Sequence, residues 1–320
     1  MGRESTGLVA PGARVASRPV GGQAVCEGVM MRGEDRWAVA VRRADGRVET
    51  RVEDVPPWCG RFERVPVVRG VAALAESFTI GVRGLTWSVE RASADAGQPV
   101  TLPSLARTVA LALGVVLTGF VIFPAALGRL AGGSHGLVVT AVEGAVRLAI
   151  LLTYLVAIGR RADVRRLFAY HGAEHRAVAT YEAGAPLTPE AARAFGTRHL
   201  RCGTTFLLLV VVVAVVVHSL AGAPGWGVLF ASRLVAVPVV AGLAYELLRA
   251  AARGAERWPV VWVLMAPGLA LQALTTREPD DGQVEVALAA LSAVLPPAGV
   301  TAPSRESEPA PRRAERRARS

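Results

Sequence analysis

Four long apolar stretches constrain the fold of this chain more than any other feature. They run over residues 105–127, 137–158, 205–220 (continuing to 223) and 227–248. An α-helix needs about 20 residues to cross roughly 30 Å of hydrocarbon. The 320 residues are 52% hydrophobic and their mean hydropathy is +0.38, which is too apolar for an ordinary soluble protein. The sequence therefore predicts an α-helical integral membrane protein with four spans and a lipid bilayer as its partner.

A fifth apolar segment, residues 258–274, is interrupted by Pro259 and by Pro267-Gly268. Prolines break the hydrogen-bond ladder of a helix, so we expect a re-entrant or interfacial segment, with a full span as the alternative. Glu143 and Arg147 lie four residues apart inside the second stretch, and Arg233 lies inside the fourth. Charges within spans are costly, so these are candidates for function or for a buried pair between Glu143 and Arg147.

The chain divides into four parts. Residues 1–18 are polar and lack the apolar core of a signal peptide, so we expect a disordered start. Residues 19–100 predict a small α+β cytosolic domain: glycine turns around a short strand over 21–32, a hairpin around Asp45-Gly46, and an amphipathic helix over 67–91. Residues 101–292 form the predicted membrane domain, with a cytosolic loop at 159–203. The Pro-, Arg- and Glu-rich residues 293–320 predict a disordered tail.

Arginine placement predicts the orientation. All 36 basic residues are Arg, and the net charge is +10. Eight Arg lie in 159–203, whereas the loop 128–136 contains only Arg129. Positive charge marks the cytosolic side, so both termini and the loop 159–203 are expected in the cytosol. No basic stripe with interleaved aromatic residues occurs, which disfavours nucleic-acid binding. The three Cys include no CxxC pair, which fits a reducing compartment without a disulfide framework.

Residues 170–176 (YHGAEHR) bring three metal-binding residue types into one short segment. In a helix, His171 and His175 lie one turn apart on the same face, with Glu174 beside them. This is the H-x-x-E-H pattern of inverted zincins, in which the two His bind zinc and the Glu is the general base. His199 and Cys202 follow in a second polar cluster and complete a ligand set that suits zinc.

The predicted site therefore holds one divalent metal, zinc by its donor types, with Glu174 as the catalytic base. The predicted ligands are His171, His175, His199 and Cys202. Glu246, near the cytosolic end of the fourth span, is a further candidate ligand. Glu182 lies about 10 Å beyond His175 along a continuous helix, which is too far to share one ion.

Four motifs give the chain a resemblance to the YqhQ-like bacterial membrane proteins. They are residues 21–32 (GGQAVCEGVMMR), 170–175 (YHGAEH), 199–204 (HLRCGT) and 275–279 (TTREP), the last continuing into 283–287 (QVEVA). The resemblance covers residues 19–292. It implies a multi-pass protein of the bacterial inner membrane with a metal-dependent site and no assigned reaction.

Two functions stay open at this point. If the metal activates water and Glu174 takes its proton, the chain is a metal-dependent membrane enzyme, hydrolytic and working at the cytosolic face. If His171, His175, His199 and Cys202 close a tetrahedron, the metal is structural, in a non-catalytic transport, assembly or regulatory protein. The placement of Glu174 favours the enzyme. Substrate, protein partners and oligomeric state are not addressed by any residue pattern.

Overall fold

The computed structural model describes residues 19–56, 62, 64–97, 102–222, 224–255 and 257–296. The segments predicted to be disordered, residues 1–18 and nearly all of 293–320, lie outside these residues, as does Cys59.

A four-stranded antiparallel sheet forms the N-terminal part of the fold. The hairpin predicted around Asp45-Gly46 is confirmed, and Gly46 takes a φ of 86° that its lack of a side chain allows. The single short strand expected within residues 21–32 is wrong: two strands pair there across the turn Cys26-Glu27, and the second of them buries four consecutive residues between the helices on the two faces of the sheet. The strands, in spatial order, are β1 (Gly21–Val25), β2 (Gly28–Arg32), β3 (Arg36–Arg42) and β4 (Val48–Asp54).

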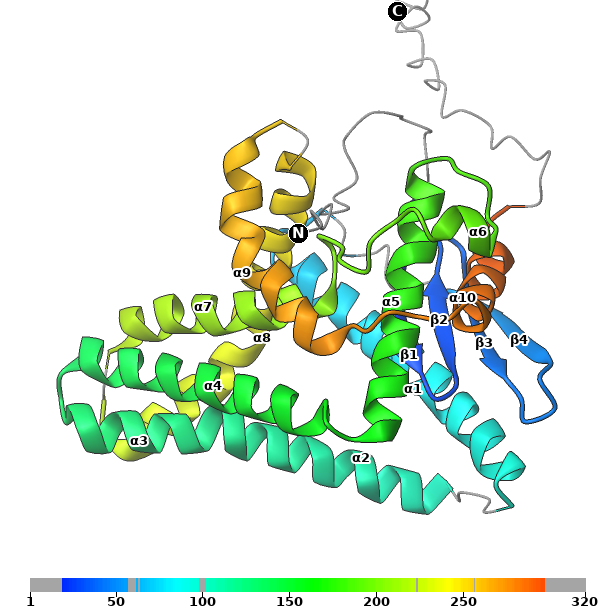
Figure 1. Cartoon of the computed structure of the whole chain (residues 1–320). Helices are drawn as coiled ribbons and strands as arrows, with labels where there is room; N and C mark the ends of the chain where they lie inside the picture. Colours follow the sequence, from blue (N-terminus) through cyan, green and yellow to red (C-terminus); the bar gives the residue numbers. More distant parts are fainter. Residues whose placement is uncertain are drawn as a thin grey trace, which may run out of the picture.

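Helices cover both faces of this sheet. Trp37 and its alternate neighbours on β3 pack against α1 (Val68–Asp95), which confirms the predicted amphipathic helix. Ala38 and the other alternate residues pack against α5 (Ala162–Glu182) and α10 (Asp281–Val294). Figure 1 shows α5 and α10 beside the strands, with α1 running beneath them. The sheet unit thus draws on three separated parts of the chain, of which residues 19–100 supply only the strands and α1.

Four helices in the described part of the chain are long and apolar enough to cross a membrane, as predicted. Figure 1 shows them gathered to one side of the sheet unit. The first is a composite of two α-helices joined by a π-helical turn. The elements are α2 (Leu102–Leu117), η2 (Thr118–Ile122), α3 (Phe123–Gly132), α4 (Gly136–Ile158), α7 (Gly203–Ala221) and α8 (Trp226–Gly254).

One buried polar cluster ties these apolar helices together. Glu143 of α4 accepts hydrogen bonds from Arg147 at 3.1 Å and from Arg233 of α8 at 3.1 Å, and its carboxylate lies 3.2 Å from Nδ1 of His218 on α7. Arg147 also donates to the carbonyl of Phe120 in the π-helical turn at 2.8 Å. The predicted pair of Glu143 and Arg147 is confirmed, and the cluster joins all four apolar helices.

Helix α9 (Pro259–Thr275) is apolar but shorter than the four candidate spans. It stays helical through Pro267, so the expected interruption at that residue is wrong; a helix can lose one hydrogen bond to proline and continue. A Cβ on Gly268 would stand 2.5 Å from Thr205 at the start of α7, and Leu271 packs at the end of α4. The C-terminal half of α9 therefore lies across one end of the apolar bundle, next to α5.

Candidate metal centre

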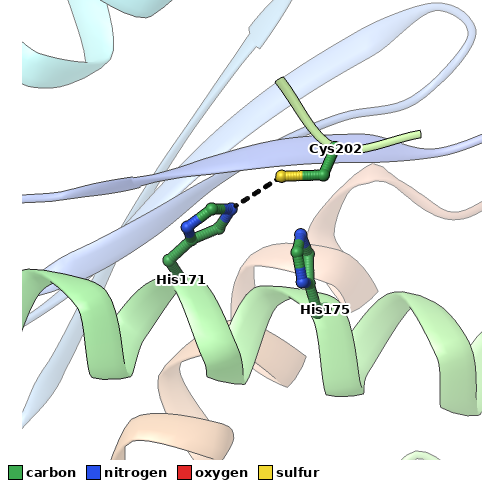
Figure 2. Close-up of side chains that lie close together, drawn as sticks. All are labelled: His171, His175 and Cys202. Atoms are coloured by element: carbon green, nitrogen blue, oxygen red, sulfur yellow. Dashed lines mark hydrogen bonds between the residues drawn. The ribbon is translucent and has the colours of Figure 1, made fainter. Parts of the chain in front are cut away.

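Helix α5 positions three of the predicted site residues. It runs unbroken from Ala162 to Glu182, with Asp163 in its first turn, where negative charge suits the helix dipole. His171 and His175 consequently project from the same face, one turn apart, and their ring centroids are separated by 4.5 Å (Figure 2). The helical spacing inferred from the sequence is confirmed.

Cys202 faces the two imidazoles from a different element. It is the N-cap residue of α7, and its Sγ accepts a hydrogen bond from the backbone amide of Thr204 at 3.3 Å. Figure 2 shows the sulfur directed toward the His pair on α5. The positive end of a helix dipole suits an anionic ligand such as a thiolate.

The donor set fits a zinc-like ion. One ligand atom from each of His171, His175 and Cys202 lies within 4.8 Å of the others, and Sγ of Cys202 is 3.3 Å from Nε2 of His171. Bond lengths of about 2.0–2.3 Å place the ligand atoms of a tetrahedral zinc ion about 3.4 Å apart. The separation between Sγ of Cys202 and Nε2 of His171 already matches this geometry.

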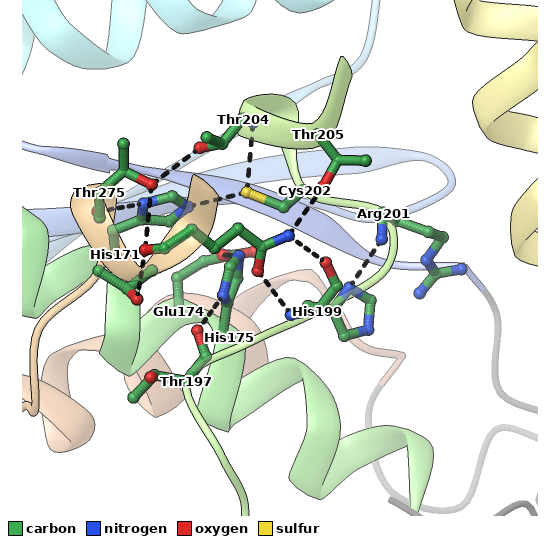
Figure 3. Close-up of polar contacts among 12 residues, drawn as sticks. His171, Glu174, His175, Thr197, His199, Arg201, Cys202, Thr204, Thr205 and Thr275 are labelled. Carbon is green, nitrogen blue, oxygen red and sulfur yellow. Dashed lines mark hydrogen bonds and ion pairs between the residues drawn. The ribbon is translucent and has the colours of Figure 1, made fainter. Parts of the chain in front are cut away.

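Backbone carbonyls fix the orientation of both rings. Nδ1 of His171 lies 2.9 Å from the carbonyl oxygen of Thr275, and Nδ1 of His175 lies 2.6 Å from that of Thr197 (Figure 3). A carbonyl oxygen only accepts, so each Nδ1 carries the proton and each Nε2 presents a lone pair toward the site. Metal-binding His residues are held in this way, which fixes the tautomer and the direction of the ligand atom.

Burial shifts the pKa values of two groups beside the ligand atoms. It lowers the pKa of His175, which keeps the imidazole neutral and able to bind a metal. Burial also raises the pKa of Glu174, an effect opposed by His171, His199, Arg201 and the amide of Gly22. The Glu174 carboxylate lies 3.5 Å from Nε2 of His175, so it is adjacent to the ligand atoms without replacing one.

His199 lies beside the centre but its ring nitrogens have other partners. Its Nε2 is 3.0 Å from Glu182, and its Nδ1 accepts from the amide of Arg201 at 3.3 Å. Its ring centroid is 5.9 Å from that of His175. Glu182 also pairs with Arg201, and although burial raises its pKa, these contacts hold that pKa below the usual value. The structure therefore gathers three of the four predicted ligands.

Glu246 is not brought to the centre. Arg69 of α1 donates to its carboxylate at 2.6 Å, on the contact between α1 and α8. Glu246 therefore forms an ion pair between α1 and α8 and is not placed to bind the ion.

Gln272 of α9 holds the segment that carries His199 and Cys202. Its amide oxygen accepts from the His199 backbone amide at 2.9 Å, and its nitrogen donates to the His199 carbonyl at 2.8 Å and to Thr205 at 2.9 Å. The Thr204 and Thr275 hydroxyls are 3.0 Å apart nearby. None of these supports was predicted. Thr204 and Thr275 lie in the 199–204 and 275–279 motifs, but their residue types suggest no chemistry, and Gln272 lies in neither motif.

A small cavity of about 40 Å³ opens onto the ligand atoms. His171, Glu174, His175 and Cys202 line it, together with the start of β1 and Arg201. A space of this size holds a single ion or a few atoms of a bound molecule.

Comparison with known proteins identifies relatives over most of the chain. Residues 65–297 match the family described as "Protein of unknown function (DUF1385)". The chain is 32% identical over 292 residues to YqhQ, an uncharacterised protein of Bacillus subtilis strain 168, which covers 86% of this chain and 92% of the relative. No solved structure matches.

Proposed function

We propose that this chain, which belongs to the DUF1385 family, is a metal-dependent hydrolase of the bacterial cytoplasmic membrane. The observation that carries the proposal is the convergence of His171, His175 and Cys202 with the buried carboxylate of Glu174 beside them. The two imidazoles and the sulfur would hold a divalent metal of zinc type.

The number of ligands supports catalysis over a structural role. Structural zinc sites are closed by four protein ligands, whereas catalytic sites use three and leave a position for water or substrate. His199, the fourth ligand that a closed site needs, has its ring nitrogens directed to Glu182 and to the amide of Arg201. The cavity that the three ligand residues line would leave room for water or substrate at a fourth position. A closed structural site would require one ring nitrogen of His199 to leave its partner, either Glu182 or the Arg201 amide, and turn to the ion.

Glu174 is the residue suited to move the proton. A zinc-type ion, when bound, lowers the pKa of a coordinated water to about 7 and so supplies a nucleophile at neutral pH. Glu174 would accept the proton that such a water loses and would pass it to the leaving group as the substrate bond breaks. Burial raises the pKa of this carboxyl, which favours its holding the proton before it is passed on.

The apolar helices and the Arg distribution support the membrane setting. Four helices have the length and composition of spans, and Cys202 directly precedes one of them. We place the protein in the membrane as a multi-pass chain, with its termini and α5 on the cytosolic side, where Arg is concentrated. The centre would then work at the cytosolic surface of the bilayer.

Glu174→Gln tests the proposal because it keeps the shape of the side chain and removes its basicity. Purified protein is loaded with zinc, its metal content is measured, and hydrolysis is followed on chromogenic esters, phosphoesters and a peptide pool. We expect metal to stay bound while hydrolysis falls about 10²–10⁴-fold. His171→Ala/His175→Ala should lose the metal itself. Glu190→Gln, at an exposed position on α6 (Pro189–Ala192), is the matched control and should change neither.

The same pair of measurements can refute the proposal. Loss of metal in Glu174→Gln would make Glu174 a ligand or its support. Full metal content with no hydrolysis by the wild-type chain on any of the three substrate classes would favour the structural alternative, a non-catalytic transport, assembly or regulatory protein.

A further inference from the structure

We infer that the substrate is a polypeptide, bound in extended form along the free edge of β1. The inference rests on the proposed hydrolase function and names its substrate class. It comes from the position of the sheet edge relative to the ligand atoms.

The pairing of β1 with β2 leaves alternate backbone groups pointing away from the sheet. Val25 pairs with Gly28 across a two-residue turn, and residues that flank such a turn exchange hydrogen bonds. Gln23 and Gly21 then bond to β2, whereas Gly22 and Ala24 face outward. The Gly22 amide donates to Glu174, and within the described part of the chain the Ala24 amide and carbonyl have no hydrogen-bond partner. Ala24 therefore offers one donor and one acceptor to an added strand.

The start of this edge borders the metal centre. Val20, Gly21 and Gly22 line the cavity that His171, Glu174, His175 and Cys202 also line. Gly21 is exposed, and a Cβ placed on it would meet nothing within 4 Å. An added strand lies about 4.8 Å from its neighbour, and residues two apart along it are separated by about 6.6 Å. A chain paired with Ala24 would thus pass a peptide group beside Gly22, where Glu174 is anchored.

The two edges of the sheet differ in a way that supports this use. Edge strands invite pairing with other chains, and proteins commonly protect them with charged residues. β4 (VETRVED) carries four charged residues, whereas β1 (GGQAV) carries none. The edge whose own residues carry no charge is the one next to the ligand atoms, and Arg201 contacts its start by donating to the Val20 carbonyl at 3.4 Å.

Other substrate classes fit the surroundings less well. Strand addition recognises a peptide through its regular donors and acceptors, which a small ester lacks. A phosphoester would need a free cation, but Arg201, the cation that lines the cavity, pairs with Glu182. An acyl chain would need an apolar groove, and Val20 and Val178 are the only aliphatic side chains of that lining.

The test uses the zinc-loaded protein in detergent with a pool of defined decapeptides, read by mass spectrometry, beside p-nitrophenyl acetate and p-nitrophenyl phosphate. We expect Glu174-dependent cleavage within the peptides. In each cleavage the carbonyl carbon gains the oxygen of water, the C–N bond breaks, and the leaving nitrogen takes the proton. The best peptide is then remade with single backbone N-methyl groups. Methylation at every second residue should raise KM about tenfold, because each paired amide loses one hydrogen bond.

Ala24→Pro removes the outward donor of β1 and should likewise raise KM, with metal content and kcat retained. Thr50→Pro, which faces outward on β4 by the same register argument, is the matched control. If Glu174-dependent hydrolysis is seen with the small esters alone, the peptide substrate is refuted and the proposed hydrolase function is kept. N-methylation effects without the alternation would overturn binding at the β1 edge. No Glu174-dependent hydrolysis of any probe would overturn the proposed function, and the inference with it.

Discussion

Gly172 lies in α5 next to His171, at a point where a methyl group has no room. A Cβ there would stand 2.2 Å from the carbonyl oxygen of Arg277 and 3.2 Å from Cγ2 of Thr197. Ordinary contact begins at 3.4 Å, so Gly172→Ala must drive the Arg277 backbone away by about 1.2 Å (3.4 minus 2.2). The two segments that would have to move are those whose Thr275 and Thr197 carbonyls hold the imidazoles of His171 and His175.

The magnitude follows from two opposed effects. Overpacking costs about 1–3 kcal/mol, and the upper end applies here because the obstacle is backbone. Replacing glycine by alanine inside a helix raises the free energy of unfolding by about 1 kcal/mol. We therefore expect Gly172→Ala to lower the free energy of unfolding by about 2 kcal/mol. Displacing the carbonyls that orient metal ligands should weaken metal affinity about 10–100-fold.

Two measurements check this prediction: unfolding in detergent followed by intrinsic fluorescence, and zinc affinity by competition with a chromogenic chelator. Gly114→Ala is the matched control, because Gly114 lies inside α2 and a Cβ there meets nothing within 4 Å. If Gly172→Ala behaves like Gly114→Ala in both assays, the close approach of α5 to Arg277 is refuted. A loss of stability with unchanged zinc affinity would refute only the role of the carbonyls.

Three further outcomes are expected. Cys202→Ser should weaken zinc retention during mild dialysis against chelator, since a hydroxyl replaces a thiolate; unchanged retention would remove Cys202 from the ligands. Glu143→Gln leaves Arg147 and Arg233 buried without their carboxylate and should lower stability by about 3–5 kcal/mol, seen as a lower unfolding midpoint in detergent. Alkaline phosphatase fused after Ser134 should be active and, fused after Arg161, inactive; the reverse pattern would invert the proposed orientation.

Local patterns were sufficient to predict much of this fold. Spans depend on length and apolarity, and the His171–His175 pair depends on helical periodicity, both of which a single segment carries. The hairpin around Gly46 is likewise specified by residues within one turn of chain. These features need no knowledge of distant partners, so the structure agrees with them.

Features that depend on distant contacts were not predictable. The carbonyls of Thr197 and Thr275 orient the imidazoles, but a backbone carbonyl is present at every residue and leaves no mark in the sequence. Glu246 pairs with Arg69, which lies 177 positions away in the sequence, so no local pattern could show that its carboxylate has this partner. The direction of the His199 ring depends similarly on the fold that brings Glu182 and the Arg201 amide to its two nitrogens.

The elements that supply the centre have a consequence for how its function can be tested. His171 and His175 belong to α5, which packs on the sheet, whereas Cys202 begins α7 and Thr275 ends α9 at one end of the apolar bundle. An ion bound between them would hold the sheet unit to the bundle and stabilise the fold by about 4 kcal/mol at a thousand times its Kd. Both the catalytic and the structural alternative therefore predict stabilisation by zinc, so a thermal shift cannot decide between them. The two alternatives differ at Glu174, which contributes no ligand atom to the three: its basicity is required only if water is activated there.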